Sequence, residues 1–135
     1  LLGESGRDWL VGDLGNDTLA GASIADLGRG DVDRLKGGAG ADRYILGASG
    51  GKVYYDDGLG GTSGVTDYAR IRTFSKAEDV IQLAGRASDY VIGRSPIEGV
   101  NGRAIFLDKP GVNELIAVVE GVNSLNLTAD YVQFV

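Results

Sequence analysis

A nine-residue pattern recurs four times in the first third of this 135-residue chain. In each copy glycine precedes an aspartate, and a bulky apolar residue follows that aspartate two places on. The copies read GESGRDWLV, GDLGNDTLA, GRGDVDRLK and GGAGADRYI. Their aspartates are nine, sixteen and nine residues apart, and an insertion at residues 21–27 explains the wider step. One unit this short cannot bury its own apolar residue, so the units must stack.

Each copy predicts a glycine-rich turn followed by a strand of about three residues. Strand residues alternate between the two faces, so the middle residue of the three points inward. Two copies then form one coil of a flattened spiral, and stacked coils share a thin core. The predicted inward residues are Leu10, Leu19, Leu35 and Tyr44.

Stacking brings aspartates from every second copy together. Asp8 should approach Asp33 on one edge, and Asp17 should approach Asp42 on the other. Opposed carboxylates repel each other. The turns should also present backbone carbonyls, because we expect no ladder pairing there. Carboxylates and carbonyls together are the ligands of a hard cation such as Ca²⁺, and its binding would then be coupled to folding.

Composition narrows the possible functions. The chain has 13 basic and 19 acidic residues, a net charge of −6, and this argues against nucleic acid as a partner. Fourteen of the acids are Asp, whose short side chain suits turns and compact oxygen cages. Cysteine and histidine are absent, which excludes thiolate sites and histidine-based catalysis. No apolar run approaches the roughly 18 residues of a transmembrane segment.

The sequence divides into two parts with different composition. Residues 1–61 hold 16 of the 23 glycines, and we predict that they form the calcium-binding repeat domain. Residues 62–135 contain short runs rich in Val, Ile, Tyr and Phe, which favour strands, and we predict a β cap there. The whole chain is therefore expected to be all-β. The predicted strands of the second part are 67–74, 79–83, 90–92, 103–107, 114–119 and 131–135.

The fourth copy, GGAGADRYI, matches the nonapeptide GGxGxDxUx in full, so residues 3–45 resemble the calcium-binding repeats of RTX proteins. The resemblance implies a parallel β-roll that continues into a C-terminal β-sandwich-like or antiparallel cap. It also implies a secreted bacterial protein that is exported unfolded by type I secretion machinery and folded by extracellular calcium. The ending YVQFV is similar to the apolar end of type I secretion signals. We expect the chain to be the C-terminal part of a longer protein, with an upstream domain as a partner.

The segments DYARIRTF and DVIQL are similar to those that follow the repeats in serralysin-type proteases. There the aspartates that match Asp67 and Asp79 belong to the end of the roll. Because the third copy is incomplete, Asp26 and Asp31 are candidates to supply a substitute oxygen beside Asp33. The expected metal-binding residues are Gly6, Asp8, Gly15, Asp17, Asp31, Asp33, Gly37, Gly40, Asp42, Asp67 and Asp79.

These observations favour a calcium-triggered folding and secretion module over an enzyme. Paired carboxylates can hydrolyse glycosides, but here the repeat accounts for them and no further base stands nearby. The alternative is a cell-surface or polysaccharide-binding module on the outer face of a calcium-stabilised roll. Trp9 should point outward, either as a ligand platform or, as we favour, toward a covering upstream part. Arg70 and Arg72 should lie on the solvent face of a strand.

Overall fold

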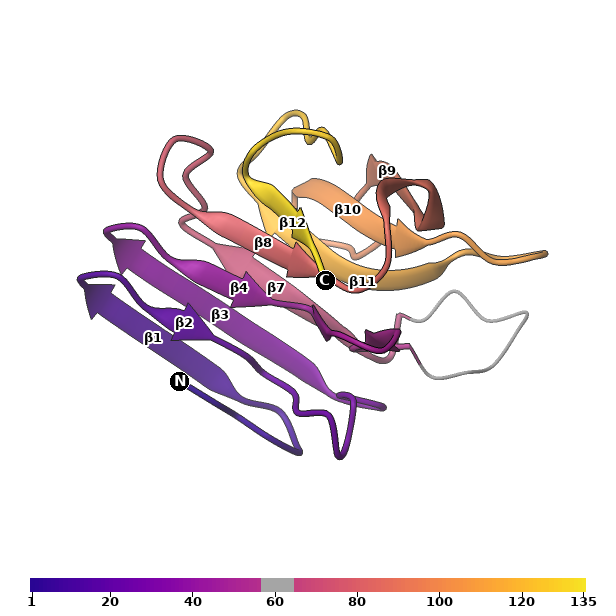
Figure 1. Ribbon diagram of the computed structural model, residues 1–135, viewed down its shortest axis with the longest axis horizontal. Coiled ribbons are helices and arrows are strands. Elements are labelled where there is room, and N and C mark those ends of the chain that lie inside the picture. The colour runs from indigo at the N-terminus through magenta and orange to yellow at the C-terminus, as the bar shows by residue number, and fades with distance from the viewer. Residues whose placement is uncertain (57–64) are drawn as a thin grey trace.

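The computed structural model describes residues 1–56 and 65–135, and within these ranges the protein is all-β, as predicted (Figure 1). The described residues contain one 3₁₀ helix, η1 (Ala87–Asp89), and no α-helix. No helix in these ranges has the length and apolar character needed to cross a bilayer. The predicted domain boundary, between residues 61 and 62, lies outside the described residues.

The larger sheet has six strands in the order β1-β3-β7-β11-β10-β9. The pairs β1–β3, β3–β7 and β7–β11 are parallel, whereas β11–β10 and β10–β9 are antiparallel, so this sheet is mixed. All six predicted strands of the second part are present in one sheet or the other. The strands of the larger sheet are β1 (Trp9–Leu14), β3 (Val32–Ala39), β7 (Tyr68–Arg72), β9 (Tyr90–Arg94), β10 (Gly102–Leu107) and β11 (Glu114–Glu120).

The smaller sheet has four strands in the order β12-β8-β4-β2, and all its pairs are parallel. A short antiparallel hairpin, β5 (Gly47–Ala48) with β6 (Lys52–Val53), follows β4. The strands of the smaller sheet are β2 (Thr18–Leu19), β4 (Arg43–Ile45), β8 (Val80–Leu83) and β12 (Val132–Phe134).

The chain alternates between the two sheets, and each passage through both is called a coil here. β1 and β2 form the first coil, β3 and β4 the second, and β7 and β8 the third (Figure 1). The third coil lies after the predicted boundary, yet it pairs with the second coil in both sheets. The core continues into the third coil because Ile71 stands opposite the inward Leu35 and Ile81 opposite the inward Tyr44.

The core lies between the two sheets and contains the residues predicted to point inward. Leu19, Leu35 and Tyr44 are fully buried, and they belong to one cluster with residues of the third coil. Leu10 is only half-buried and packs against the edge of this cluster. Its position explains the difference, because β1 is the outermost strand of the larger sheet among the described residues.

Two of the strands are longer than predicted, because β1 and β3 continue into the glycine turns that follow them. Asp13 pairs with Gly38 and Leu14 with Ala39 in the parallel ladder. The expectation that the turns would be free of ladder pairing was therefore wrong on this edge. The reason is that turns of the same backbone shape stack in register, so N–H groups of one can bond carbonyls of the next.

A second apolar cluster covers part of the opposite, outer face of the larger sheet. The loop between β9 and β10 contributes Val100, which packs with side chains of β7, β10 and β11. This cluster leaves the outer faces of β1 and β3 uncovered except at Val32. Its buried members are Tyr68, Val100, Ala104, Leu115 and Val118.

Replacing Leu35 with Ala tests the importance of the stacked core. Leu35 is fully buried, whereas Leu14, a matched control on β1, is 83% exposed. We expect Leu35→Ala to lower the free energy of unfolding by roughly 2–5 kcal/mol and Leu14→Ala by less than about 0.5 kcal/mol. Urea unfolding in excess Ca²⁺, followed by circular dichroism, measures both. Equal effects of the two substitutions would contradict the assigned core.

Candidate metal centre

Five aspartates form two columns at opposite ends of the stacked coils. Each aspartate stands directly before its strand or at the strand's beginning, so parallel pairing of the strands aligns the aspartates. β1 and β3 run in one direction in Figure 1 and β2, β4 and β8 run back, which separates the two columns. The first column is Asp8 and Asp33, and the second is Asp17, Asp42 and Asp79. Asp67 lies level with Asp31 instead, because Ala69 stands opposite Asp33 in the ladder.

One carboxylate oxygen in each column ties one coil to the next. The backbone N–H of Asp8 donates to Asp33 Oδ1 at 2.8 Å, and that of Asp17 donates to Asp42 Oδ1 at 2.9 Å. Asp42 repeats the contact by donating its N–H to Asp79 Oδ1 at 2.9 Å. Both predicted neighbour pairs, Asp8 with Asp33 and Asp17 with Asp42, are therefore confirmed.

The second oxygen of three of these carboxylates has no hydrogen-bond partner among the described residues. Oδ2 of Asp8, of Asp17 and of Asp42 is buried and accepts no hydrogen bond from the described residues. A buried polar atom without a partner costs roughly 1–3 kcal/mol, and more when it carries charge. These three atoms therefore call for a ligand that is positively charged and that prefers oxygen.

Glycines make the space that these oxygens face. A Cβ on Gly12 would lie 2.5 Å from Asp17 Oδ2 and 2.7 Å from the carbonyl oxygen of Gly37. A Cβ on Gly3 would collide with Asp8 Oδ2, and one on Gly37 with Asp42 Oδ2. Carboxylate and carbonyl oxygens from adjacent coils thus approach each other at positions where glycine has no side chain.

This set of donors fits Ca²⁺, which takes six to eight oxygen ligands. Within the described residues no three acidic side chains gather around one point. Carboxylates alone therefore do not complete a site, and backbone carbonyls of the turns are needed as further ligands. The second column supplies such a carbonyl between the first and second coils. There, Asp17 Oδ2 and the Gly37 carbonyl oxygen both lie next to Gly12.

Asp33, in the first column, has a different environment. Its Oδ2 accepts a hydrogen bond from the Tyr55 hydroxyl at 2.7 Å, in addition to the contact from Asp8. The pKa of Asp33 is raised to about 6, chiefly by burial. The two hydrogen bonds lower this pKa, and the charges of Asp8 and Asp31 raise it. The repeat pattern does not predict this contact, because Tyr55 lies outside the four copies.

The two candidates for a substitute oxygen have separate roles. Asp31 Oδ2 accepts the backbone N–H of Gly6 at 3.0 Å and so connects the first two coils. Asp26 instead accepts N–H bonds from Ser23 and Gly28 inside the insertion. Burial alone would raise the pKa of Asp26, but these hydrogen bonds outweigh burial and lower it. Asp26 therefore stabilises its own loop.

Asp67 and Asp79 stand at the third coil. Asp67 is fully buried, and its Oδ2 accepts the N–H of Gly30 at 3.3 Å. Asp79 uses both oxygens for backbone N–H groups, because Ser75 donates to Oδ2 at 2.7 Å while Asp42 donates to Oδ1. Hydrogen bonds thus close the second column at this end.

The predicted glycines lie in the turns. Gly6, Gly15 and Gly40 have φ values of 105°, 104° and 126°, which favour glycine. Gly37 donates its N–H to the Tyr44 hydroxyl at 2.9 Å. The first-position glycines Gly3 and Gly12, which face the aspartate oxygens, were not among the predicted site residues.

The insertion lies inside the third copy and not before it. A Cβ on Gly21 would collide with Asp33 Oδ2, whereas one on Gly28 would meet the ring of Tyr55. Gly21 therefore takes the first position of the third copy, nine residues after Gly12, and the extra residues follow it. The predicted position of the insertion, residues 21–27, was wrong because GRG at residues 28–30 resembles the start of a copy.

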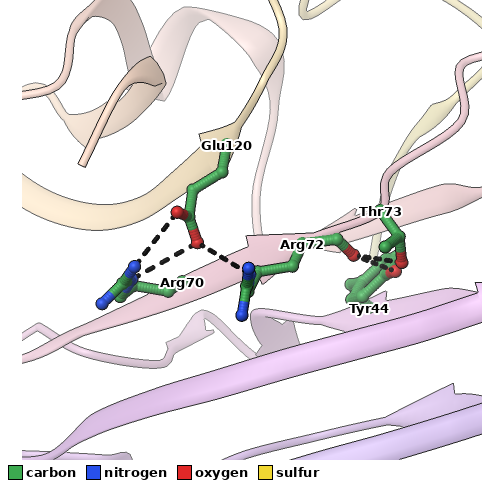
Figure 2. A network of polar contacts seen from close by, with 5 residues as sticks. All are labelled: Tyr44, Arg70, Arg72, Thr73 and Glu120. Atoms are coloured by element: carbon green, nitrogen blue, oxygen red, sulfur yellow. Dashed lines mark hydrogen bonds and ion pairs between the residues drawn. The ribbon is translucent and has the colours of Figure 1, made fainter.

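Tyr44 adds a link between the second and third coils (Figure 2). Its buried hydroxyl donates to the carbonyl oxygen of Arg72 at 3.1 Å, and Thr73 Oγ1 donates to the same oxygen at 2.6 Å. Burial raises the pKa of Tyr44 to about 12, so the hydroxyl stays protonated as a donor at neutral pH. This position thus combines an inward apolar ring with a polar contact to the next turn.

Comparison with known proteins identifies the repeats. The family model of the RTX calcium-binding nonapeptide repeat matches residues 1–23 and 27–49, with four copies. The unmatched residues 24–26 belong to the insertion. No curated protein sequence matches the chain. The predicted family is confirmed, and because RTX nonapeptide repeats bind Ca²⁺, calcium is the cofactor of this region.

Substituting Asp17 or Asp42 with Asn tests the second column. Asn keeps the size of the side chain and an oxygen acceptor, but it removes the charge that Oδ2 directs toward Gly12 or Gly37. We expect each change to weaken Ca²⁺ binding about tenfold or more, because calcium affinity depends on the number of charged ligands. Calorimetric titration measures this effect, and Asp130→Asn, an exposed position, is the control. Identical titrations of all three variants would show that these residues are not ligands.

Substituting Tyr55 with Phe tests the first column. The loss of the hydroxyl leaves Asp33 Oδ2 buried without its donor, so the free energy of unfolding should fall by roughly 1–3 kcal/mol. Tyr54→Phe is the matched control, because the Tyr54 side chain is also buried and its hydroxyl bonds none of the described residues. Urea unfolding of both variants provides the comparison, and a stability of Tyr55→Phe equal to that of the control would refute the role of this hydroxyl.

Proposed function

Because residues 1–23 and 27–49 belong to the family of RTX calcium-binding nonapeptide repeats, we propose that this chain is a calcium-triggered folding module of a secreted bacterial protein. One observation carries the proposal. The fold buries three carboxylate oxygens, on Asp8, Asp17 and Asp42, that find no hydrogen-bond donor among the described residues. Ca²⁺ supplies the positive charge that neutralises such oxygens.

The two sheets would then be the walls of a parallel β-roll. Support comes from the alternation of β1, β2, β3, β4, β7 and β8 between two parallel-paired layers. In the second column, Asp17, Asp42 and the carbonyl group of Gly37 would hold the ion, with the turn residues Gly15 and Gly40 beside them. In the first column, Asp8, Asp31 and Asp33 would contribute to a second site, with Gly6 in its turn.

Metal binding and folding would be one event, because the ligands come together only when the coils stack. At low calcium the aspartates of adjacent coils repel each other and oppose stacking. Extracellular calcium modules have dissociation constants on the order of 10⁻⁴–10⁻³ M, which suits a switch between the cytosol and the outside. The chain would stay unfolded during export through type I secretion machinery and fold outside the cell together with an upstream domain of its parent protein.

The second part of the chain would close the roll. Asp79 satisfies both its oxygens with backbone N–H groups, so the second column needs no metal at its end. The antiparallel strands β9 and β10 end the larger sheet beyond β11. Asp67 and Asp79 would thus belong to the junction between a repeat domain (1–61) and a cap (62–135).

The module would carry no catalysis. The RTX repeat is a structural, non-enzymatic unit, and the aspartates of this chain bond backbone N–H groups of the adjacent coil. A negative net charge also speaks against nucleic acid as its partner.

Circular dichroism with and without chelator tests the switch. In excess chelator we expect loss of the β signal, because the unpartnered carboxylates then have no counter-ion, and in millimolar Ca²⁺ we expect its return. Mg²⁺ is the matched control and should fail at the same concentration, since it demands tighter octahedral geometry and dehydrates reluctantly. A native spectrum in excess chelator would rule out calcium-triggered folding.

A further inference from the structure

The outer face of the larger sheet carries a block of basic side chains beside its free edge. Arg34 and Lys36 on β3 lie directly opposite Arg70 and Arg72 on β7 in the parallel ladder. We call these four residues the basic block. Together with Arg7, it holds five of the 13 basic residues of a chain whose net charge is −6.

The positive charge of the basic block is largely uncompensated. Like charges directly opposite each other destabilise a sheet, so the fold gains nothing from this arrangement. One carboxylate, Glu120 on β11, bonds Arg70 at 3.0 and 3.3 Å and lies 3.6 Å from Arg72 (Figure 2). Arg34 and Lys36 form no ion pair with any residue that the structure describes, so at least two cations remain available to a ligand.

A pocket adjoins the basic block at the first coil. It has a volume of about 240 Å³, and its lining includes Arg7, Trp9 and Arg34 together with Val32 and Asp8. Trp9 is 62% exposed, and its ring centre lies 6.0 Å from the guanidinium carbon of Arg34. The pocket is smaller than the roughly 300–1,000 Å³ of most small-molecule sites, so it suits a single ring of a longer molecule.

From this geometry we infer that the outer face of β1, β3 and β7 binds an acidic polysaccharide, a chain that carries carboxylates on its sugar rings. One sugar ring would stack on Trp9, and Arg7 and Arg34 would bond its carboxylate. The chain would continue over Lys36, Arg70 and Arg72, whose spacing follows the strands. Trp9 is then a ligand platform, and the interpretation that an upstream part covers it is not needed.

Nucleic acid fits this face less well. Proteins that bind single strands stack successive bases on several aromatic side chains. Among the described residues, Trp9 is the one aromatic side chain that is exposed. A polysaccharide needs only one such platform, since its charge is bound by the arginines and the lysine.

Intrinsic fluorescence tests the inference directly, because Trp9 is the only tryptophan of the chain. The calcium-loaded protein is titrated with oligogalacturonate, with dextran as a neutral oligosaccharide of similar length, and with a single-stranded oligonucleotide. We expect a saturable change with oligogalacturonate alone. Absence of a change with oligogalacturonate, or an equal response to dextran, would overturn the proposal, and tighter binding of the oligonucleotide would replace the polysaccharide with nucleic acid.

Paired variants separate the basic block from overall charge. Arg34→Gln with Lys36→Gln removes two charge-assisted contacts and should weaken oligogalacturonate binding about tenfold or more. Lys52→Gln with Arg94→Gln removes the same charge at two exposed positions on β6 and β9, and should change affinity less than about twofold. Circular dichroism in Ca²⁺ verifies that both variants fold. Equal losses in the two variants would show that net charge, and not this face, binds the ligand.

Discussion

The structure depends on how each repeat aspartate divides its two oxygens. In Asp42, Oδ1 accepts the N–H of Asp17 from the preceding coil, and Oδ2 lies against Gly37, where any Cβ would collide with it. The first contact ties the coils together, while the second buries a negative charge without a donor. In Asp42, stacking and the need for a cation therefore arise from the same side chain. Asp33 and Asp79 also accept an N–H from the preceding coil, but their second oxygens have hydrogen-bond donors, from Tyr55 and Ser75.

The close approach of these oxygens to the backbone requires glycine at some positions more strictly than turn geometry does at others. Gly12 is required because a Cβ there would collide with the Asp17 carboxylate and the Gly37 carbonyl oxygen, and Gly37 because a Cβ would collide with the Asp42 carboxylate and the Tyr44 hydroxyl. Gly15 and Gly40 are favoured for a different reason, their positive φ. A nine-residue period thus combines two separate requirements, an open oxygen-lined space and a sharp turn, with one inward apolar residue for the core.

Local periodicity was sufficient to predict the aspartate pairs and the inward residues. In parallel stacked coils, residues at the same position of the repeat lie side by side. It was insufficient where a contact comes from outside the repeat. Nothing in the spacing points to Tyr55, which reaches Asp33 from after the hairpin, or to the ladder between the turns at Asp13 and Gly38. Spacing also misplaced the insertion. Gly28 has the sequence spacing to Asp33 that the first glycine of a copy should have, but in the structure Gly21 is the glycine that lies against Asp33.

The repeat also leaves one set of positions without a structural task. Inward residues fill the core, and the aspartates at the edges are the proposed calcium ligands. Outward residues such as Arg34 and Lys36 belong to neither group. Opposed cations there cost stability, and a fold stabilised by Ca²⁺ at its edges can tolerate that cost. Each bound Ca²⁺ also makes the acidic chain less negative, which favours the approach of a polyanion to the basic block. Binding on the outer face would therefore depend on calcium, because calcium folds the protein and reduces its negative charge. The Ca²⁺ ions themselves do not need to touch the ligand.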